Sequence, residues 1–190
     1  LDTACASGYN EILINTNGTL LNDSLCKGLM NYREKMILSC SINGQEEIHD
    51  ALRGKGSYQR AIKGLSTSLE HDICVDVYTT VCKMMIPGLP AFTEFLFTNF
   101  PGVRCLFFIQ LRRVENDVYP LAGHMLDPGD FISLVRLMGF LSLYGYPVSF
   151  LENALYNVVC SSLQLKWLPR SRSIFRPRRL MILHNRKMTA

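Results

Sequence analysis

The stretch that decides the fold is EILINTNGTLLND, residues 11–23. Its residues 12–14 form a continuous apolar run, which is typical of a strand buried on both faces. Asn15, Thr16, Asn17 and Gly18 then favour a turn, because Asn and Gly tolerate positive φ angles. A helical pattern begins at Asp23. The stretch therefore predicts a strand, a polar turn at its carboxyl end and a helix.

This unit of strand and helix repeats along the chain. Short runs rich in β-branched and aromatic residues predict strands at 11–15, 36–41, 74–81, 103–111 and 147–150. Helical periodicity predicts helices at 23–33, at 45–68 with a break at 54–57, at 90–99 and at 128–144. Parallel strands need crossovers of a dozen or more residues, and these are nearly always right-handed. The repeat therefore predicts an α/β fold, a parallel sheet or barrel with helices outside it.

In such folds the functional groups lie in the loops that follow the carboxyl ends of the strands. Here those loops contain the turn at 15–18, SING at 41–44, TTVCKMM at 79–85 and QLRRVEND at 110–117. Ser41 ends one strand, and Arg53 follows it by twelve residues. A hydroxyl and a guanidinium so placed suit a small carboxylate or hydroxylated ligand, held by charge-assisted hydrogen bonds.

The cysteines and histidines show no metal-binding spacing. The seven cysteines are isolated, with no CxxC or CxxxCxxC motif, and the four histidines are scattered, which predicts surface or loop positions for them. Single cysteines in odd number favour a reducing, cytoplasmic setting. The most apolar stretch, residues 131–151, is broken by Arg136, Gly145 and Pro147. We therefore expect a soluble cytoplasmic protein that associates with no membrane.

Charge is distributed unevenly. All 16 acidic residues precede residue 153, whereas residues 153–190 carry 8 of the 20 Lys and Arg residues. The segment WLPRSRSIFRPRRL, residues 167–180, combines arginines with aromatics, as nucleic-acid-binding segments do. A charge run is more often a solvated connector, or one face of a strand that pairs with acidic chain missing here. We favour this interpretation over nucleic-acid binding.

Two consecutive strand-end turns of this form resemble the radical S-adenosylmethionine (SAM) enzymes, especially the peptide- and protein-modifying, SPASM-like branch with a cysteine-rich C-terminal extension. That family often has a TNG turn after its third strand, here residues 16–18, and a Ser-x-Asp-Gly turn after its fourth, here 41–44 with Asn43 in the Asp position. In that branch a His-Asp pair, an Arg-Gly pair and an aromatic follow, here at 49–50, 53–54 and Tyr58. The resemblance spans about residues 8–150 and is most specific between 11 and 65.

The resemblance implies a partial (β/α)6 barrel that binds a 4Fe-4S cluster and SAM at the carboxyl ends of its strands. Reductive cleavage of the sulfonium then gives a 5′-deoxyadenosyl radical, which abstracts hydrogen from a peptide or protein substrate. By motif position, Ser41 would contact the ribose and Arg53 the methionine carboxylate. The other residues of the implied cofactor pocket are Thr16, Asn17, Asn43 and Thr80. No catalytic residue and no metal ligand is implied on this chain.

The family holds its cluster with CxxxCxxC after the first strand, a motif that this chain lacks. Residues 1–8, LDTACASG, are typical of a helix end closed by Gly8, and residues 178–190 of a strand followed by a turn. These features predict an N-terminally truncated radical SAM enzyme that assembles no cluster by itself. We divide it into a partial barrel at 1–150 and a basic extension, or the start of an auxiliary domain, at 151–190.

Truncation at this point would leave the strand at 11–15 with an exposed apolar edge, which is a template for pairing with other chains. We therefore expect poor solubility, an oligomer formed through this strand, or an edge covered by the basic tail. Two other functions remain open. One is a non-catalytic α/β module that binds a peptide or protein, and the other, which the residues favour least, is a nucleic-acid-binding protein that uses the arginine-rich tail.

Overall fold

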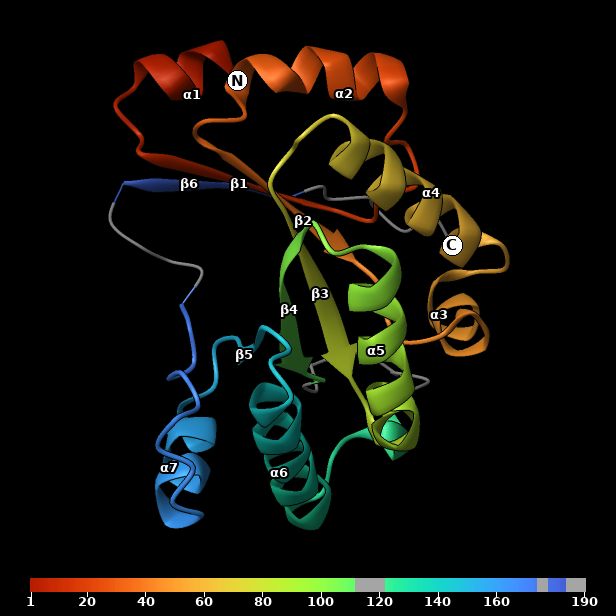
Figure 1. Cartoon of the computed structure of the whole chain (residues 1–190), viewed down its shortest axis with the longest axis vertical. Helices are drawn as coiled ribbons and strands as arrows, with labels where there is room; N and C mark the ends of the chain where they lie inside the picture. The colour runs from red at the N-terminus through yellow and green to blue at the C-terminus, as the bar shows by residue number, and fades with distance from the viewer. Residues whose placement is uncertain (112–121, 174–177, 184–190) are drawn as a thin grey trace.

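A computed structural model describes residues 1–111, 122–173 and 178–183. These residues form a six-stranded sheet with the order β5-β4-β3-β2-β1-β6, in which every pairing is parallel (Figure 1). The strands are β1 (Glu11–Thr16), β2 (Met36–Ser41), β3 (Val75–Val81), β4 (Val103–Gln110), β5 (Val148–Phe150) and β6 (Arg179–Leu183). The predicted α/β class and parallel sheet are confirmed.

Helices connect most of these strands. They are α1 (Asp2–Ala6), α2 (Asp23–Leu29), α3 (Glu46–Arg53), α4 (Ser57–Glu70), α5 (Leu89–Asn99), α6 (Pro128–Leu143) and α7 (Ala154–Ser162). The predicted break at 54–57 is confirmed, because Gly54 and Gly56 take φ angles of 97° and 73°, which end α3 and lead into α4. The nine-residue helix α7 was not predicted.

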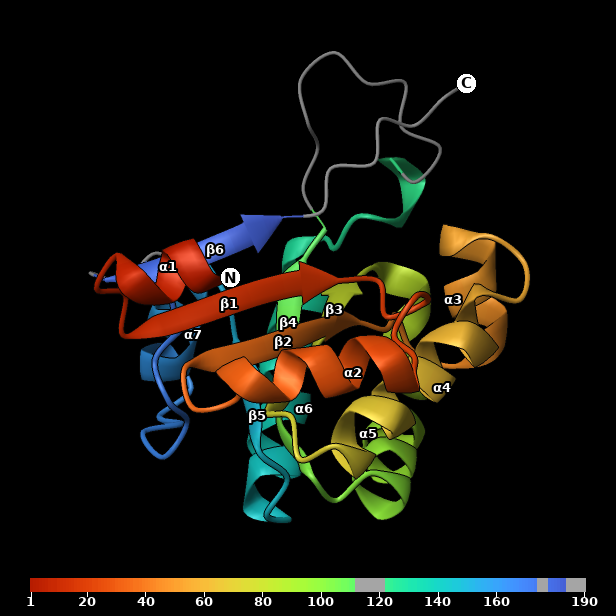
Figure 2. The same ribbon diagram turned by 90° about the horizontal axis from the view of Figure 1, so that it is seen from above.

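Both faces of the central strands are buried. Helices α2, α4, α5 and α6 cover one face, as Figures 1 and 2 show, and the core there includes Leu38, Val77 and Phe108. The opposite face, which we call the inner face, carries a second apolar cluster that consists of Leu13, Ile37, Tyr78, Cys105, Phe107 and Leu151. Each leucine, isoleucine or phenylalanine of this kind contributes about 1.5–3 kcal/mol when it is fully buried. Side chains alternate along a strand, so the residues that lie two positions from these also face inward.

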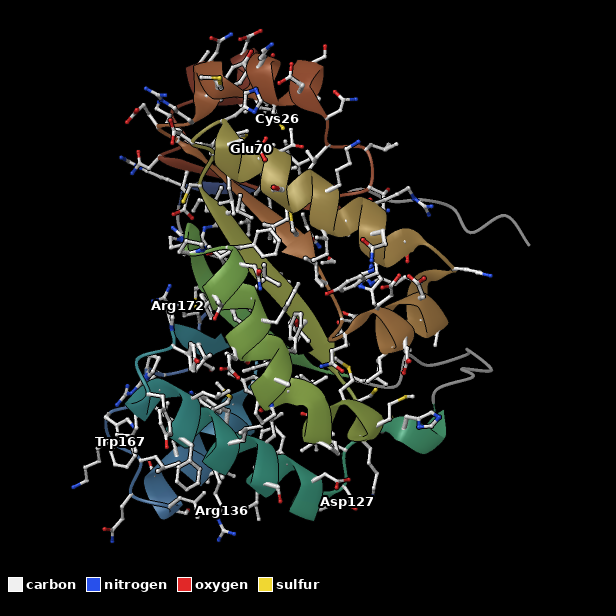
Figure 3. All side chains as sticks on the ribbon, turned by 45° about the vertical axis from the view of Figure 1, so that its right-hand side comes forward. Cys26, Glu70, Asp127, Arg136, Trp167 and Arg172 are labelled. Atoms are coloured by element: carbon white, nitrogen blue, oxygen red, sulfur yellow. The ribbon has the colours of Figure 1, made fainter. Side chains whose placement is uncertain are left out.

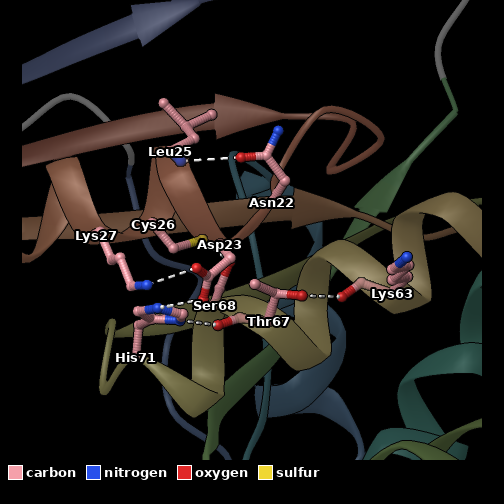
Figure 4. Close-up of polar contacts among 9 residues, drawn as sticks. All are labelled: Asn22, Asp23, Leu25, Cys26, Lys27, Lys63, Thr67, Ser68 and His71. Atoms are coloured by element: carbon pink, nitrogen blue, oxygen red, sulfur yellow. Dashed lines mark hydrogen bonds and ion pairs between the residues drawn. The ribbon is translucent and has the colours of Figure 1, made fainter.

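Polar contacts fix α2 against α4 (Figure 4). Asn22 caps α2 by accepting a hydrogen bond from the Leu25 amide at 2.9 Å. Asp23 in the first turn of α2 lies 2.7 Å from Lys27 Nζ and 3.0 Å from Nε2 of His71, which follows α4. Cys26 and Ser68 meet in the buried helix interface, with 3.7 Å between Sγ and Oγ.

The basic tail supplies the strand that flanks β1. Strand β6 pairs with β1 in parallel, with Leu13 opposite Met181, and Arg179 forms an ion pair with Glu11. The expectation that the β1 edge stays exposed and mediates oligomerisation is therefore wrong for this structure, because β1 lies between β2 and β6. The alternative, that the tail covers this edge, is confirmed. Strand β6 belongs to the predicted extension at 151–190 and yet joins the sheet.

A second tail residue contacts the other edge of the sheet. The Arg172 amide donates to the Phe150 carbonyl at 2.8 Å, and the Arg172 carbonyl accepts from the Glu152 amide at 3.1 Å. The Arg172 guanidinium lies 5.5 Å from the centre of the Phe107 ring, in cation–π contact. The interpretation of the tail as a solvated connector, or as paired to missing acidic chain, is thus wrong at Arg172 and Arg179, because both contact the sheet. Within the described residues, no helix is long and apolar enough to cross a bilayer.

Candidate functional site

The turn after β1 is held by its own side chains. Thr16 Oγ1 accepts a hydrogen bond from the Gly18 amide at 3.1 Å, and Asn17 Oδ1 accepts from the Thr19 amide and hydroxyl at 3.1 and 2.9 Å. Gly18 has a φ of 76°, which other residues rarely adopt. The turn packs against α4 at Gly64, where a Cβ atom would lie 2.1 Å from the Gly18 carbonyl oxygen. Two of the predicted cofactor residues, Thr16 and Asn17, therefore stabilise the loop itself.

A polar group occupies the carboxyl half of the inner face. Asn15 Oδ1 accepts hydrogen bonds from the hydroxyls of Ser39 and Ser41, each at 3.3 Å. Asn15 and Ser39 are opposite each other in the β1–β2 register, and Ser41 follows two residues later on the same face. Ser41, a predicted ligand, is half-buried; Asn15 was predicted only as part of the turn and not as a site residue, and Ser39 was missed. Their signal in the sequence was a polar residue at an inward position of an apolar strand.

Asn43 joins two neighbouring strand ends. Its side-chain Oδ1 accepts a hydrogen bond from the Thr80 amide at 3.2 Å, which brings together two predicted site residues. Its own amide donates to His49 Nδ1 at 3.0 Å. His49 is only 1% exposed, so the expectation of a surface or loop histidine is wrong there. Burial, aided by the Arg53 charge, lowers the pKa of His49 to about 4, which keeps the ring neutral with Nδ1 as an acceptor.

Asp50 and Arg53 both lie in α3, the helix that follows the turn after β2. Asp50 accepts hydrogen bonds from the Gly56 and Tyr58 amides at 2.5 and 2.8 Å and thereby caps the start of α4. These backbone donors, Tyr58 foremost, lower the pKa of the Asp50 carboxyl. Arg53 is the last residue of α3 and is exposed. The predicted approach of Arg53 to Ser41 stays a prediction.

The loop after β3 is tied to α6 at the same end of the sheet. Lys83 Nζ lies 3.1 Å from Asp127 and 3.2 Å from Asp130. Asp127 precedes α6, where Figure 3 labels it, and forms a reciprocal capping box with Asp130. The next predicted loop, QLRRVEND, is described only at Gln110 and Leu111, and its remainder lies outside the described residues.

Two curated proteins share sequence with this chain. One is the antilisterial bacteriocin subtilosin biosynthesis protein AlbA of Bacillus subtilis, 32% identical over 83 residues, which are 43% of this chain and 18% of AlbA. The other is Fe-coproporphyrin III synthase of Methanosarcina barkeri, 32% identical over 85 residues, 44% of this chain and 21% of the synthase. The matched segments thus span about a fifth of each relative. No model of a known protein family matches the chain.

Solved structures share its fold. Native anSMEcpe with bound AdoMet and the Kp18Cys peptide superposes with a TM-score of 0.60 at 18% identity, over 73% of this chain and 39% of that one. SuiB of Streptococcus suis superposes with a TM-score of 0.61 at 14% identity, over 79% and 34%. The sequence relatives and these structural neighbours point to the same family. The chain resembles radical SAM enzymes, in sequence over less than half of its length and in fold over most of it. The described sheet and its helices match the partial barrel of these radical SAM neighbours.

The described residues do not fit the iron–sulfur cluster of a radical SAM enzyme. No three His, Cys, Asp or Glu side chains of the described ranges are placed to hold a metal ion together. The cysteines are all free, and Cys40 and Cys105 are buried, which raises the pKa of each thiol to about 12. A cluster requires converging thiolates, so no step that depends on one is assigned to these residues.

The residues at the carboxyl ends of β1, β2 and β3 do fit the polar parts of SAM. Ser41 and Thr80 are partly exposed hydroxyls that can donate to and accept from a ribose. Arg53 is an exposed cation on the helix that follows β2, suited to a carboxylate. Asn43 is fixed on both sides, by His49 and Thr80. The donor set is therefore compatible with the adenosyl and methionine portions of the cofactor.

Proposed function

We propose that this chain supplies the SAM-binding face of a radical enzyme that modifies peptides or proteins. The observation that carries the proposal is the polar rim at the carboxyl ends of β1 to β3, where Asn15, Ser41, Asn43 and Thr80 are linked from strand to strand. The AdoMet-bound structure of anSMEcpe, which has the same fold, supports SAM as the ligand. Radical chemistry would come from bound SAM together with a cluster held outside the described residues.

Within this proposal each residue has a defined task. Ser41, oriented by Asn15, would bind the ribose, and Arg53 would bind the methionine carboxylate. His49 would act as a positioning residue, because it accepts from the Asn43 amide and so fixes the turn after β2. Thr16 and Asn17 would shape the neighbouring wall through their turn.

The substrate class and the domain division belong to the same proposal. The anSMEcpe structure contains a bound peptide, and AlbA is named for bacteriocin biosynthesis, which supports a peptide substrate. We propose residues 1–150 as the partial barrel and residues 151–190 as an extension that contributes β6 to it.

Calorimetric titration of SAM into the whole chain tests the proposal. Arg53→Ala should weaken binding about tenfold or more, as expected for the loss of a hydrogen bond to a charged group. Arg33→Ala is the matched control, because Arg33 precedes β2 at the opposite end of the sheet and pairs only loosely, at 3.6 Å, with Glu34. Equal weakening in both variants, or none in Arg53→Ala, contradicts the assigned role.

The lack of a metal-binding group in the described ranges supports one alternative, a non-catalytic module that binds a peptide. The same calorimeter distinguishes the two functions. Binding of SAM favours the cofactor face, whereas a peptide that binds tightly to a chain with no affinity for SAM favours the module.

A further inference from the structure

A pocket lies at the opposite end of the sheet from the polar rim. It encloses about 350 Å³ next to the first residues of β4 and β5, within the usual range for a small-molecule site. Its walls come from Arg104 and Cys105 of β4, Pro147 and Ser149 at β5, and Pro169 and Arg172 of the tail. Figure 3 labels Arg172 beside this edge of the sheet.

Among the side chains that line this pocket, one positive charge is not compensated by an ion pair. Arg104 is held by Asp76 through two hydrogen bonds, of 2.9 and 2.6 Å, so this pair is neutral overall. Arg172 presents its guanidinium to the face of Phe107, and among the described residues no carboxylate forms an ion pair with it. The Glu152 carboxylate, which accepts a hydrogen bond from Ser173, is not among the residues that line the pocket. The N–H groups of Arg172 therefore remain suited to an oxyanion.

A buried hydroxyl points to a missing partner in the same pocket. Ser149 is 1% exposed, and its Oγ has no hydrogen-bond partner within the part of the chain that the structure describes. Ser149 is opposite Phe107 in the β4–β5 register, so it shares the inner face with the ring that Arg172 covers. A buried hydroxyl without a partner is unfavourable, and an acceptor bound in the pocket would satisfy it.

We propose that this pocket binds a small monocarboxylate, with its oxygens on Arg172 and Ser149. A single negative charge matches the single uncompensated cation, whereas a phosphate dianion would leave excess negative charge beside Asp76. The walls at Pro147 and Pro169 suit a short apolar body attached to the carboxylate. This site lies apart from the proposed SAM face and does not depend on it.

Titration of the uniformly ¹⁵N-labelled chain with sodium propionate tests the site, with sodium chloride at equal ionic strength as the blank. We expect shifts in the amide signals of Cys105 and Ser149 and in the Arg172 Nε–H signal, with saturation by about 10 mM, which corresponds to weak binding. Inorganic phosphate at about pH 8, where it is mostly a dianion, should bind more weakly. Tighter binding of phosphate overturns the monocarboxylate assignment, and the absence of shifts with propionate overturns the site.

Single substitutions test which side chains bind the propionate. Arg172→Gln should weaken propionate binding about tenfold or more, and Ser149→Ala should weaken it about threefold to tenfold. Arg170→Gln is the matched control, because Arg170 lies two residues away and lines a different pocket, and its affinity should stay within about twofold. If Arg172→Gln fails to fold, the propionate shifts in the wild type and the Ser149→Ala affinity decide. Unchanged affinity in Ser149→Ala with shifts elsewhere overturns the proposal.

Discussion

The two ends of the inner face are stabilised in different ways. At the carboxyl end, neutral hydrogen bonds join side chains to turns and to the adjacent strand, as Asn43 does with Thr80. At the amino end, ion pairs join residues far apart in the chain, Glu11 with Arg179 and Asp76 with Arg104. Neutral groups leave the carboxyl rim able to exchange partners with a polar ligand, whereas charged pairs hold the amino half in one arrangement.

The largest expected effect concerns the packing of the β1 turn on α4. Gly64→Ala places a methyl group 2.1 Å from the Gly18 carbonyl oxygen, so the backbone must move, and we expect a loss of about 3 kcal/mol in the free energy of unfolding. Urea unfolding measures this. Gly28→Ala in α2 is the control, because its Cβ meets no atom within 4 Å, and it should gain about 0.5–1 kcal/mol. Similar changes in both variants would refute the close approach.

The second effect concerns the contribution of His49 to the free energy of unfolding and how this contribution changes with pH. The pKa of His49 falls from 6.5 to about 4 on folding, so the folded state binds fewer protons than the unfolded state between these values. The stabilisation is therefore fully present above pH 6.5 and is lost as the pH falls toward 4, by about 3 kcal/mol.

Unfolding free energies of the wild type and of His49→Gln across this range check the prediction. Other groups, Asp50 among them, titrate in both proteins, so the difference between the two curves isolates His49. That difference should shrink as the pH falls. A difference that stays constant with pH would show that His49 is not buried as a neutral acceptor.

The smallest expected effect concerns the ion pair between Glu11 and Arg179 at the amino ends of β1 and β6. Glu11→Gln should cost about 1 kcal/mol, because the pair with Arg179 is only partly buried, and should speed hydrogen exchange in β6. The exposed pair of Arg33 and Glu34 provides the control, and Glu34→Gln should change the stability by less than about 0.5 kcal/mol. The exchanged pair, Glu11→Arg with Arg179→Glu, should restore protection. Protection of β6 that is unchanged in Glu11→Gln would mean that the ion pair does not hold the strand.

Local features of this fold were predictable from the sequence. The apolar runs, the Asn-Gly turns and the glycines at 54 and 56 specify their conformations through neighbouring residues, so the strands, the turns and the helix break were found. The buried His49 was missed, although its position beside Ile48 and three residues before Leu52 places it on the apolar side of α3.

Contacts between distant residues were not predictable in this way. Arginines in a basic tail look solvated in the sequence, and the acidic partner of Arg179 lies 168 positions earlier, at Glu11. The pairing of β6 with β1 was predicted only as one of several outcomes for the β1 edge, because no local pattern specifies which distant strand will pair there. The same limit applies to Ser149, whose missing partner is evident only from its burial.

The measurement that tests the central claim most directly is a map of the amide signals that shift when SAM is added to the ¹⁵N-labelled chain. If the carboxyl rim is the cofactor face, the signals of Ser41, Asn43 and Thr80 should shift with a common affinity. Those of Val75 and Cys105, at the amino ends of β3 and β4, should stay in place. Shifts confined to the amino end, or no shifts at saturating SAM, would contradict the account.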